Sequence, residues 1–211
     1  MKRHVENAKQ SPAKKECLTG ENMWFGPKNT FLSTFYMHPL DMKDDERYFS
    51  VEHFYQCEKY NHGMQFPNPE TREYYQLLRA CDTNMKAVAL GCMKKHRFSS
   101  TWYVSKTHKH LGTIDECIDR YRGKVSRVEH WHSRNVEVMT RAQRRKFSQP
   151  KLAKLLKSTV GHSLRYMQPS GEFWSYASRA GEDVPRTGEN MLGSILESIR
   201  EEIGKKSKHR S

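Results

Sequence analysis

The chain has 211 residues, of which 36% are hydrophobic, 11% aromatic and 29% charged, and its formal net charge at pH 7 is +13. This length suits one globular domain, and the aromatic content is sufficient for a hydrophobic core, which argues against a wholly disordered chain. No apolar run approaches the roughly 20 residues that span a bilayer, and none follows the basic start, so we expect no membrane contact and no secretory signal peptide, and predict a cytoplasmic or nuclear protein.

The positive charge is concentrated at the two ends of the chain. Basic residues exceed acidic residues by three in residues 1–20 and by four in residues 205–211, which leaves +6 for the remainder. Short charged ends are usually solvated, so we predict basic flexible tails over residues 1–20 and 204–211 around a domain over residues 21–203. The tails either serve solubility or contact nucleic acid, and both interpretations stay open.

The predicted elements begin with a short strand at Trp24-Phe25, which is ended by a Gly-Pro pair. Residues 31–36 also have a β-type composition. Apolar residues then recur at helical spacing in several segments, the first of which is preceded by a capping residue, Ser50, and ended by Gly63. The predicted helices cover residues 51–62, 70–80, 84–95, 113–128, 134–147, 150–157 and 190–203. We therefore predict a mainly α fold, of the α+β class with a few short strands, in a single compact domain.

The cysteines and histidines do not form a metal-binding pattern. The five cysteines include no C-x-x-C pair, and the two H-x-H pairs, at residues 108–110 and 130–132, supply two ligands each. A zinc site needs three or four ligands, each oriented by a hydrogen bond to a further residue. We therefore predict no metal and no cofactor.

One helical stripe carries side chains with catalytic chemistry. Glu52, Gln56 and Lys59 lie at i, i+4 and i+7 of the first predicted helix, among aromatic residues. A lysine buried beside aromatic rings becomes less basic and hence nucleophilic, and a nearby glutamate can transfer protons, which suits cleavage of a bond to an anomeric carbon. The same spacing is common on solvated helix faces, and taken alone it favours that simpler interpretation.

A series of motifs runs through the chain in a fixed order. The series comprises Phe31-Leu-Ser-Thr-Phe-Tyr36, Tyr48-Phe-Ser-Val-Glu-His-Phe-Tyr-Gln-Cys-Glu-Lys-Tyr60, Ala89-Leu-Gly91, the helix from Trp131 to Met139, Lys146-Phe-Ser-Gln149, the stretch from Leu155 to Thr159, Phe173-Trp174 and Gly188-Glu-Asn-Met-Leu-Gly193. Together these motifs resemble those of the NADAR/YbiA-like superfamily, and the resemblance covers the chain from about Phe25 to Ile203.

The resemblance implies a single YbiA-like domain that binds a phosphorylated sugar or ADP-ribose. It also implies an N-glycosidase that hydrolyses an N-ribosidic bond, either of an ADP-ribosylated guanine base or of a ribosylamino-pyrimidine phosphate. Carried over, Lys59 attacks the anomeric carbon or forms a Schiff base with the ring-opened sugar, while Glu52 transfers protons. The residues implied to bind substrate are Ser33, His53, Tyr55, Gln56, Trp131, Trp174 and Asn190.

Two departures from the family pattern fall near the implied site. Tyr166 and Gly171 stand where the family has acidic residues, and Ser175 stands where it has glycine. The loss of two carboxylates supports an alternative to the enzyme: a catalytically degenerate module that binds ADP-ribose or a nucleotide, or that holds a protein partner.

Residues 97–129 form an insertion relative to the family. The amphipathic segment 113–128 within it either covers an edge of the core or docks a protein partner, and both interpretations stay open.

A further hypothesis is nucleic-acid binding, through the basic tails together with a basic cluster near the middle of the chain. The cluster comprises Arg141, Arg144, Arg145 and Lys146.

Overall fold

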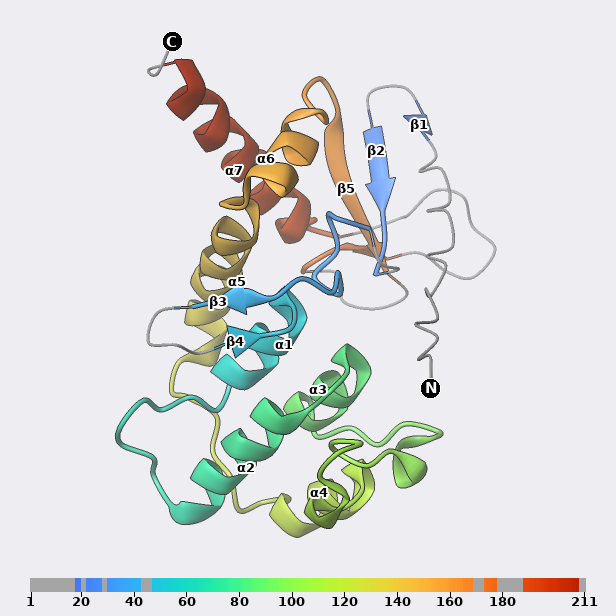
Figure 1. Ribbon diagram of the computed structural model, residues 1–211, viewed down its shortest axis with the longest axis vertical. Helices are drawn as coiled ribbons and strands as arrows, with labels where there is room; N and C mark the ends of the chain where they lie inside the picture. The colour runs from blue at the N-terminus through green and yellow to red at the C-terminus, as the bar shows by residue number, and fades with distance from the viewer. Residues whose placement is uncertain are drawn as a thin grey trace, which may run out of the picture.

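A four-stranded sheet with the strand order β1-β2-β5-β6 lies at the upper right of Figure 1. The computed structural model describes residues 18–19, 22–27, 30–42, 47–168, 173–177 and 188–208. The strands are β1 (Leu18–Thr19), β2 (Asn22–Phe25), β5 (Ser163–Gln168) and β6 (Tyr176–Ala177). β1 and β2 are antiparallel, whereas β2 and β5 are parallel and place Phe25 opposite Tyr166. This pairing joins the first described strands to the last third of the chain.

The rest of the described chain is mostly helical. The helices are α1 (Val51–Glu58), α2 (Pro69–Ala80), α3 (Asn84–Gly91), α4 (Ile114–Tyr121), α5 (Trp131–Phe147), α6 (Pro150–Lys157) and α7 (Met191–Lys208), with short 3-10 turns at Ser99–Thr101 and Lys109–Leu111. A small antiparallel pair, β3 (Leu40–Asp41) and β4 (Arg47–Tyr48), precedes α1. The prediction of a mainly α fold with a few short strands is therefore confirmed.

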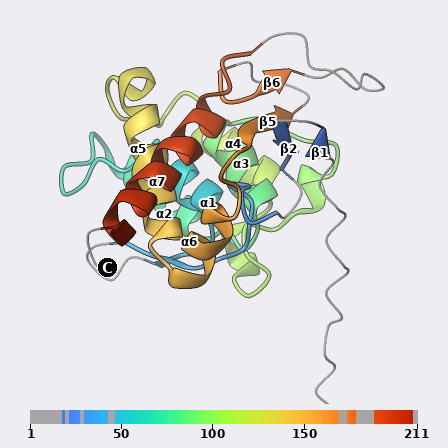
Figure 2. The same ribbon diagram turned by 90° about the horizontal axis from the view of Figure 1, so that it is seen from above.

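The helix α1 is the centre of the packing. All of its residues are buried, and it contacts α2, α3 and α5. α2, α3 and α4 lie at the bottom of Figure 1, whereas α6 and α7 lie at the top beside β5. Seen from above, α7 runs across the molecule next to α5 and α6, both of which it contacts (Figure 2). α1 is thus surrounded on several sides, and its polar residues must find partners inside the protein.

Local sequence explains where α1 begins and ends. The Oγ of Ser50 accepts a hydrogen bond from the backbone N–H of His53 at 3.0 Å, as a helix N-cap does. The helix ends at Glu58 rather than at residue 62, because the N–H of Tyr60 turns back to the carbonyl of Cys57. Gly63, with φ of +68°, then takes a left-handed conformation that suits glycine.

Other sequence predictions of local structure also differ from the structure, and the predicted helix 84–95 already ends at Gly91. Residues 31–36 form turns rather than a strand, because the backbone N–H groups of Ser33 and Tyr36 bond to carbonyls three residues earlier and the N–H of Phe35 bonds to Ser33 Oγ. α5 begins at Trp131, three residues earlier than predicted, after His130 adopts a left-handed φ of +53°.

The predicted tails are described only in part. Residues 18–19 pair with β2, and residues 204–208 continue α7, so ordered structure extends into both predicted tails. Residues 1–17 and 209–211 lie outside the described residues.

The predicted insertion packs a helix on the core. α4 is shorter than the predicted segment 113–128, and it begins at a complete capping box between Thr113 and Glu116. Its apolar face, which includes Ile114, Ile118 and Tyr121, is buried, and the hydroxyl of Tyr121 donates to Glu73 Oε2 at 2.8 Å. The insertion therefore covers one edge of the core. A protein partner on its outer face stays a prediction.

Within the described ranges, no helix is both long and apolar enough to cross a membrane.

Candidate functional site

The polar stripe of α1 forms a buried chain of hydrogen bonds. Thr34 Oγ1 donates to Glu52 Oε2 at 2.9 Å, Gln56 Nε2 donates to Glu52 Oε1 at 2.6 Å, and Lys59 Nζ donates to Gln56 Oε1 at 2.6 Å. The relative exposures of Glu52, Gln56 and Lys59 are 8%, 3% and 7%. The stripe is therefore not a solvated helix face. Instead, a carboxyl group and an amine lie inside the protein, linked through the amide of Gln56.

A glycine on α3 makes room for this chain. A Cβ atom placed on Gly91 would lie 2.1 Å from Gln56 Oε1 and 2.9 Å from Gln56 Cβ, which no side chain can accept. The next residue, Cys92, is exposed, and its Sγ lies 3.6 Å from Lys59 Nζ. α3 thus approaches α1 closely enough to support Gln56, and the exposed Cys92 marks where Lys59 comes nearest to solvent.

The surroundings of Lys59 favour the neutral amine. Burial lowers the pKa of Lys59, and the positive charge of Arg127 acts in the same direction, while the charges of Cys92 and Glu52 oppose it. A lysine must lose its proton before the nitrogen can act as a nucleophile, so this environment suits covalent chemistry.

A group of aromatic rings lies next to the same amine. The Nζ of Lys59 lies 5.3 Å from the centre of the Tyr55 ring. That ring contacts Trp131 at a centroid distance of 5.2 Å and Trp174 at 5.7 Å. Three side chains that the resemblance assigns to substrate binding, from α1, α5 and the segment before β6, therefore meet at Tyr55, whose ring lies beside Lys59. Trp131 is buried, whereas Trp174 is partly exposed.

Tyr166 lies at the same site, at a position where the family has an acidic residue. It is 3% exposed, packs on Phe25 at a centroid distance of 5.2 Å, and has its pKa raised by burial and by the charge of Glu52. The hydroxyl therefore stays protonated and can donate a hydrogen bond, but it cannot replace a carboxylate. Gly171, the other departure, lies outside the described residues.

Asn190 is engaged by the backbone of β5. Its Oδ1 accepts from the N–H of Tyr166 at 2.8 Å, and its Nδ2 donates to the carbonyl of Leu164 at 2.9 Å. A Cβ on Gly193 would lie 2.1 Å from that same carbonyl, so this glycine lets α7 approach β5. Asn190 thus holds the strand that carries Tyr166, and its direct contact with substrate stays a prediction.

Ser33 and His53 also bond to backbone groups. Ser33 Oγ donates to the carbonyl of Pro27 at 3.2 Å, and His53 Nε2 donates to the carbonyl of Leu78 at 2.9 Å. The ring of His53 stacks on Phe49 at 4.0 Å and is 2% exposed. Both side chains are therefore buried and bonded to the backbone, and their direct contact with substrate stays a prediction.

His53 makes the stability of the fold depend on pH. Burial lowers its pKa to about 4, whereas an unfolded chain binds the proton near the ordinary value of 6.5. Between these values the unfolded state holds more protons, so the free energy of unfolding should fall by about 3 kcal/mol as the pH drops from 6.5 to 4. Urea unfolding at several pH values checks this, and His53→Gln should flatten that part of the curve. The exposed His132→Gln variant is the control, and an equal slope in all three proteins would contradict the prediction.

Lys146, which was predicted from the sequence to lie in a basic surface cluster, is buried beneath the candidate site. It is 1% exposed, its Nζ donates to the carbonyl of Ser33 at 2.7 Å, and burial lowers its pKa to about 7. It therefore holds the turn that carries Thr34, the partner of Glu52. The K-F-x-Q motif was the only feature of the sequence that pointed to this role. The prediction that Lys146 belongs to a basic surface cluster is wrong, because its side chain is buried.

Metal ligands do not gather in the part of the chain that the structure describes: it contains no group of three or more His, Cys, Asp or Glu side chains suited to an ion. The rings of His108 and His110 are 5.8 Å apart, but this pair has no third ligand among the described residues.

Comparison with known proteins agrees with this fold. The structure is similar to the NMR structure of the E. coli protein YbiA, with a TM-score of 0.58 and 19% sequence identity over 92% of each chain. At this identity the similarity establishes a common fold. The model of the NADAR domain family matches residues 20–204. The chain therefore belongs to the NADAR family, which confirms the resemblance predicted from its motifs. No curated protein matches the sequence.

Proposed function

We propose that this chain is an N-glycosidase that hydrolyses an N-ribosidic bond, either of an ADP-ribosylated guanine base or of a ribosylamino-pyrimidine phosphate. The observation that carries the proposal is the buried Glu52–Gln56–Lys59 chain beside two tryptophans. Burial of titratable groups is unfavourable unless they are well hydrogen-bonded, and a buried lysine with a perturbed pKa is typical of an active site.

The chemistry follows from the positions of the two charged groups. The lone pair of the neutral Lys59 amine attacks the anomeric carbon, and the bond from that carbon to the base nitrogen breaks with its electrons leaving on the base. Glu52 accepts the proton that the attacking amine releases and returns it to the departing base. Water then adds to the sugar–lysine adduct, releases the sugar and restores the amine. If the sugar ring opens first, C1 stays bonded to the base nitrogen as an imine. The lysine amine then adds to C1, the bond to the base breaks with a proton passing to the base, and a Schiff base remains that water hydrolyses.

The aromatic side chains account for recognition of the base. A base that stacks on a tryptophan gains about 1–3 kcal/mol regardless of its identity. Trp174 is partly exposed, so a base can stack on its ring, while Tyr55 packs against Trp174 and Trp131 packs against Tyr55.

The proposal is tested with two substrates and a chemical trap. Purified protein is incubated with an ADP-ribosylated guanine oligonucleotide and, separately, with a ribosylamino-pyrimidine phosphate, and release of base or sugar is followed by chromatography. We expect release from one of them. Cyanoborohydride should reduce a Schiff base to a stable amine, which peptide mass spectrometry would place on Lys59. No release from either substrate would overturn the proposal.

A second candidate function is binding without catalysis, and Tyr166 is the observation that favours it. A buried tyrosine in place of a carboxylate leaves Glu52 as the acidic group that the structure shows in contact with the Gln56–Lys59 chain. A degenerate module would bind ADP-ribose with its base still attached. Calorimetric binding of ADP-ribose together with no product release would support this second function.

A further inference from the structure

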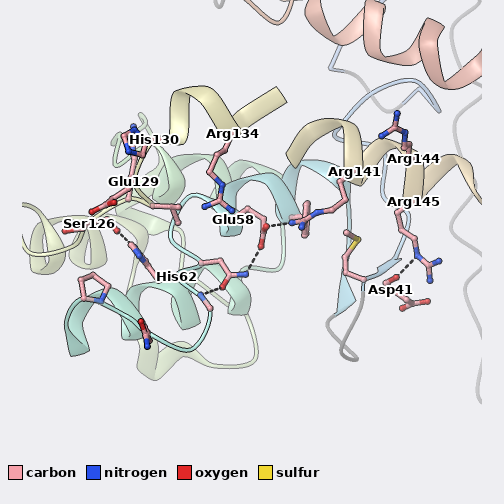
Figure 3. A pocket seen from close by; sticks show the side chains of 18 of the residues that line it. Asp41, Glu58, His62, Ser126, Glu129, His130, Arg134, Arg141, Arg144 and Arg145 are labelled. Carbon is pink, nitrogen blue, oxygen red and sulfur yellow. Dashed lines mark hydrogen bonds and ion pairs between the residues drawn. The ribbon is translucent and has the colours of Figure 1, made fainter. Parts of the chain in front are cut away.

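A groove of about 1490 Å³ opens on the other side of α1 from the Glu52–Lys59 chain. Figure 3 shows that α5 forms one wall, and the rest of the lining comes from the end of α1 and the residues up to Pro67, from the segment before α5, and from Asp41 and Met42. A helix turns by about 100° per residue, so Gln56 and Glu58, two positions apart, point in nearly opposite directions. Glu58 lines the groove, whereas Gln56 belongs to the candidate active site.

Arginines dominate the wall that α5 provides. Arg134, Arg141 and Arg145 lie at i, i+7 and i+11, which places them on one stripe of the helix, and Arg144 lies beside them. At 1.5 Å per residue this row extends for about 17 Å along the axis. Arg127, from the segment before α5, faces the same groove.

Most of these guanidinium groups keep donors free for a ligand. Arg141 is paired with the buried Glu58, and Arg144 forms a two-pronged pair with Glu202 at 2.6 and 3.1 Å. Across the described ranges, no carboxylate lies within ion-pair distance of Arg127, Arg134 or Arg145, all of which are exposed. Arg127 Nε donates to Tyr60 Oη and Arg145 Nε to the backbone carbonyl of Asp41.

The acidic groups of the groove do not cancel this charge. The carboxylate of Asp41 is paired with Arg47 at 2.9 Å, and that of Glu58 with Arg141, which leaves Glu129 as the third acidic residue in the lining. Arginine binds phosphate through two parallel hydrogen bonds, and its planar group is less strongly hydrated than an ammonium. A row of such groups is suited to a ligand with regularly repeated negative charges.

We propose that this groove binds a single strand of nucleic acid through its phosphates. A strand with the helical rise of 3.4 Å per nucleotide presents about five phosphates over the length of the arginine row. The choice of a single strand rests on the proposed function, since chemistry on a base requires that the base is out of a duplex stack. The basic cluster predicted from the sequence is thereby revised: Arg141, Arg144 and Arg145 belong to the groove, whereas Lys146 is buried.

Arg127 connects the groove to the candidate active site. It lines the groove, and its charge also acts on Lys59. The N–H of the next residue, Val128, donates to the carbonyl of Lys59 at 2.8 Å. A strand that contacts Arg127 therefore lies at the end of α1, where it can pass from the arginine row toward Lys59. The groove would thus favour a nucleic-acid-borne substrate over a free metabolite.

The binding test uses the full chain and unmodified 15-nucleotide probes. Fluorescence anisotropy measures the Kd of labelled single-stranded DNA and RNA for the native protein and for the double variant Arg134→Ala, Arg145→Ala. For the double variant we expect a Kd about tenfold higher than that of the native protein at 100 mM salt. The slope of log Kd against log salt concentration should also be shallower, by the amount that about two phosphate contacts contribute. The matched control is Lys151→Ala, Lys154→Ala, which removes two exposed charges from α6 outside the groove.

Three outcomes would overturn the groove proposal: no loss of affinity in the arginine variant, an equal loss in the lysine control, or equally strong competition by an acidic peptide of the same charge. Thermal unfolding of each variant shows that the fold is retained. The proposed function is tested separately, with an ADP-ribosylated guanine mononucleotide. If native protein binds the probe through the groove but hydrolyses nothing, the groove proposal stands and the proposed function fails. If both hold, the arginine variant should lose turnover of the oligonucleotide and keep turnover of the mononucleotide.

Discussion

Replacement of Lys59 by arginine should reduce base release by at least about a thousandfold. Arginine keeps the positive charge and much of the length, but its guanidinium does not lose its proton in proteins and so cannot attack carbon. Initial rates with the preferred substrate, measured at saturating concentration, give the loss in kcat. Lys59→Ala should lose at least as much, and neither variant should form the adduct that cyanoborohydride traps.

The control for this prediction is Lys94→Arg. Lys94 is an exposed lysine two residues after Cys92, so the same exchange nearby should leave the rate unchanged. A Lys59→Arg variant with native activity would show that the residue acts through its charge alone. A loss of activity that follows a loss of folding, seen as a lower unfolding temperature, would also contradict a specific role for the amine.

Replacement of Gly91 by alanine should reduce activity by about a hundredfold, since misplacement of a reacting group by about 1 Å has effects of this size. The added methyl group would lie 2.1 Å from Gln56 Oε1, so Gln56 must move and its hydrogen bonds to Glu52 and Lys59 must break. Overpacking of this kind also destabilises a protein by about 1–3 kcal/mol.

Two further variants separate the effects of Gly91→Ala. Gly204, on α7, has no atom within 4 Å of the position of an added Cβ, so Gly204→Ala should leave activity unchanged and stabilise the helix by up to about 1 kcal/mol. The double variant Gly91→Ala, Gln56→Gly removes the clash, because the three nearest atoms to the added Cβ, including Gln56 Cβ at 2.9 Å, all belong to the Gln56 side chain. It should recover stability without activity. Full activity in this double variant would show that Gln56 does not connect Glu52 to Lys59.

The sequence predicts well that Glu52, Gln56 and Lys59 lie on one face of α1, because helical periodicity fixes which side chains share a face. Once residues 51–58 are assigned to a helix, the spacing of Glu52, Gln56 and Lys59 places their side chains on the same face. Their burial was not predictable, since it depends on α3 and on Gly91, which approach α1 from outside the motif. Local composition was also misleading at residues 31–36, where strand-forming residues have no strand partner and instead form turns that hold Thr34 against Glu52.

The basic cluster predicted from the sequence shows a second limit of sequence-based prediction. Arg145 and Lys146 are neighbours in sequence, but one turns to the groove and the other to the core, because consecutive positions on a helix differ by about 100°. A run of charges therefore indicates a basic region without showing which side chains a ligand can reach. β5 was not predicted, since its pairing with β2 depends on residues far apart in sequence.

The parallel pairing of β2 with β5 has a consequence for synthesis on the ribosome. β2 emerges early, but its partner follows only after the whole helical middle of the chain has been translated. Contacts between such distant residues form late, because a long loop must close first. Tyr166 can come near Glu52, and Asn190 can secure the strand, only after helices α1 to α6 have been translated. The surroundings of Lys59 are therefore completed late, and a nascent chain carries this amine before Tyr166 and Asn190 are in place.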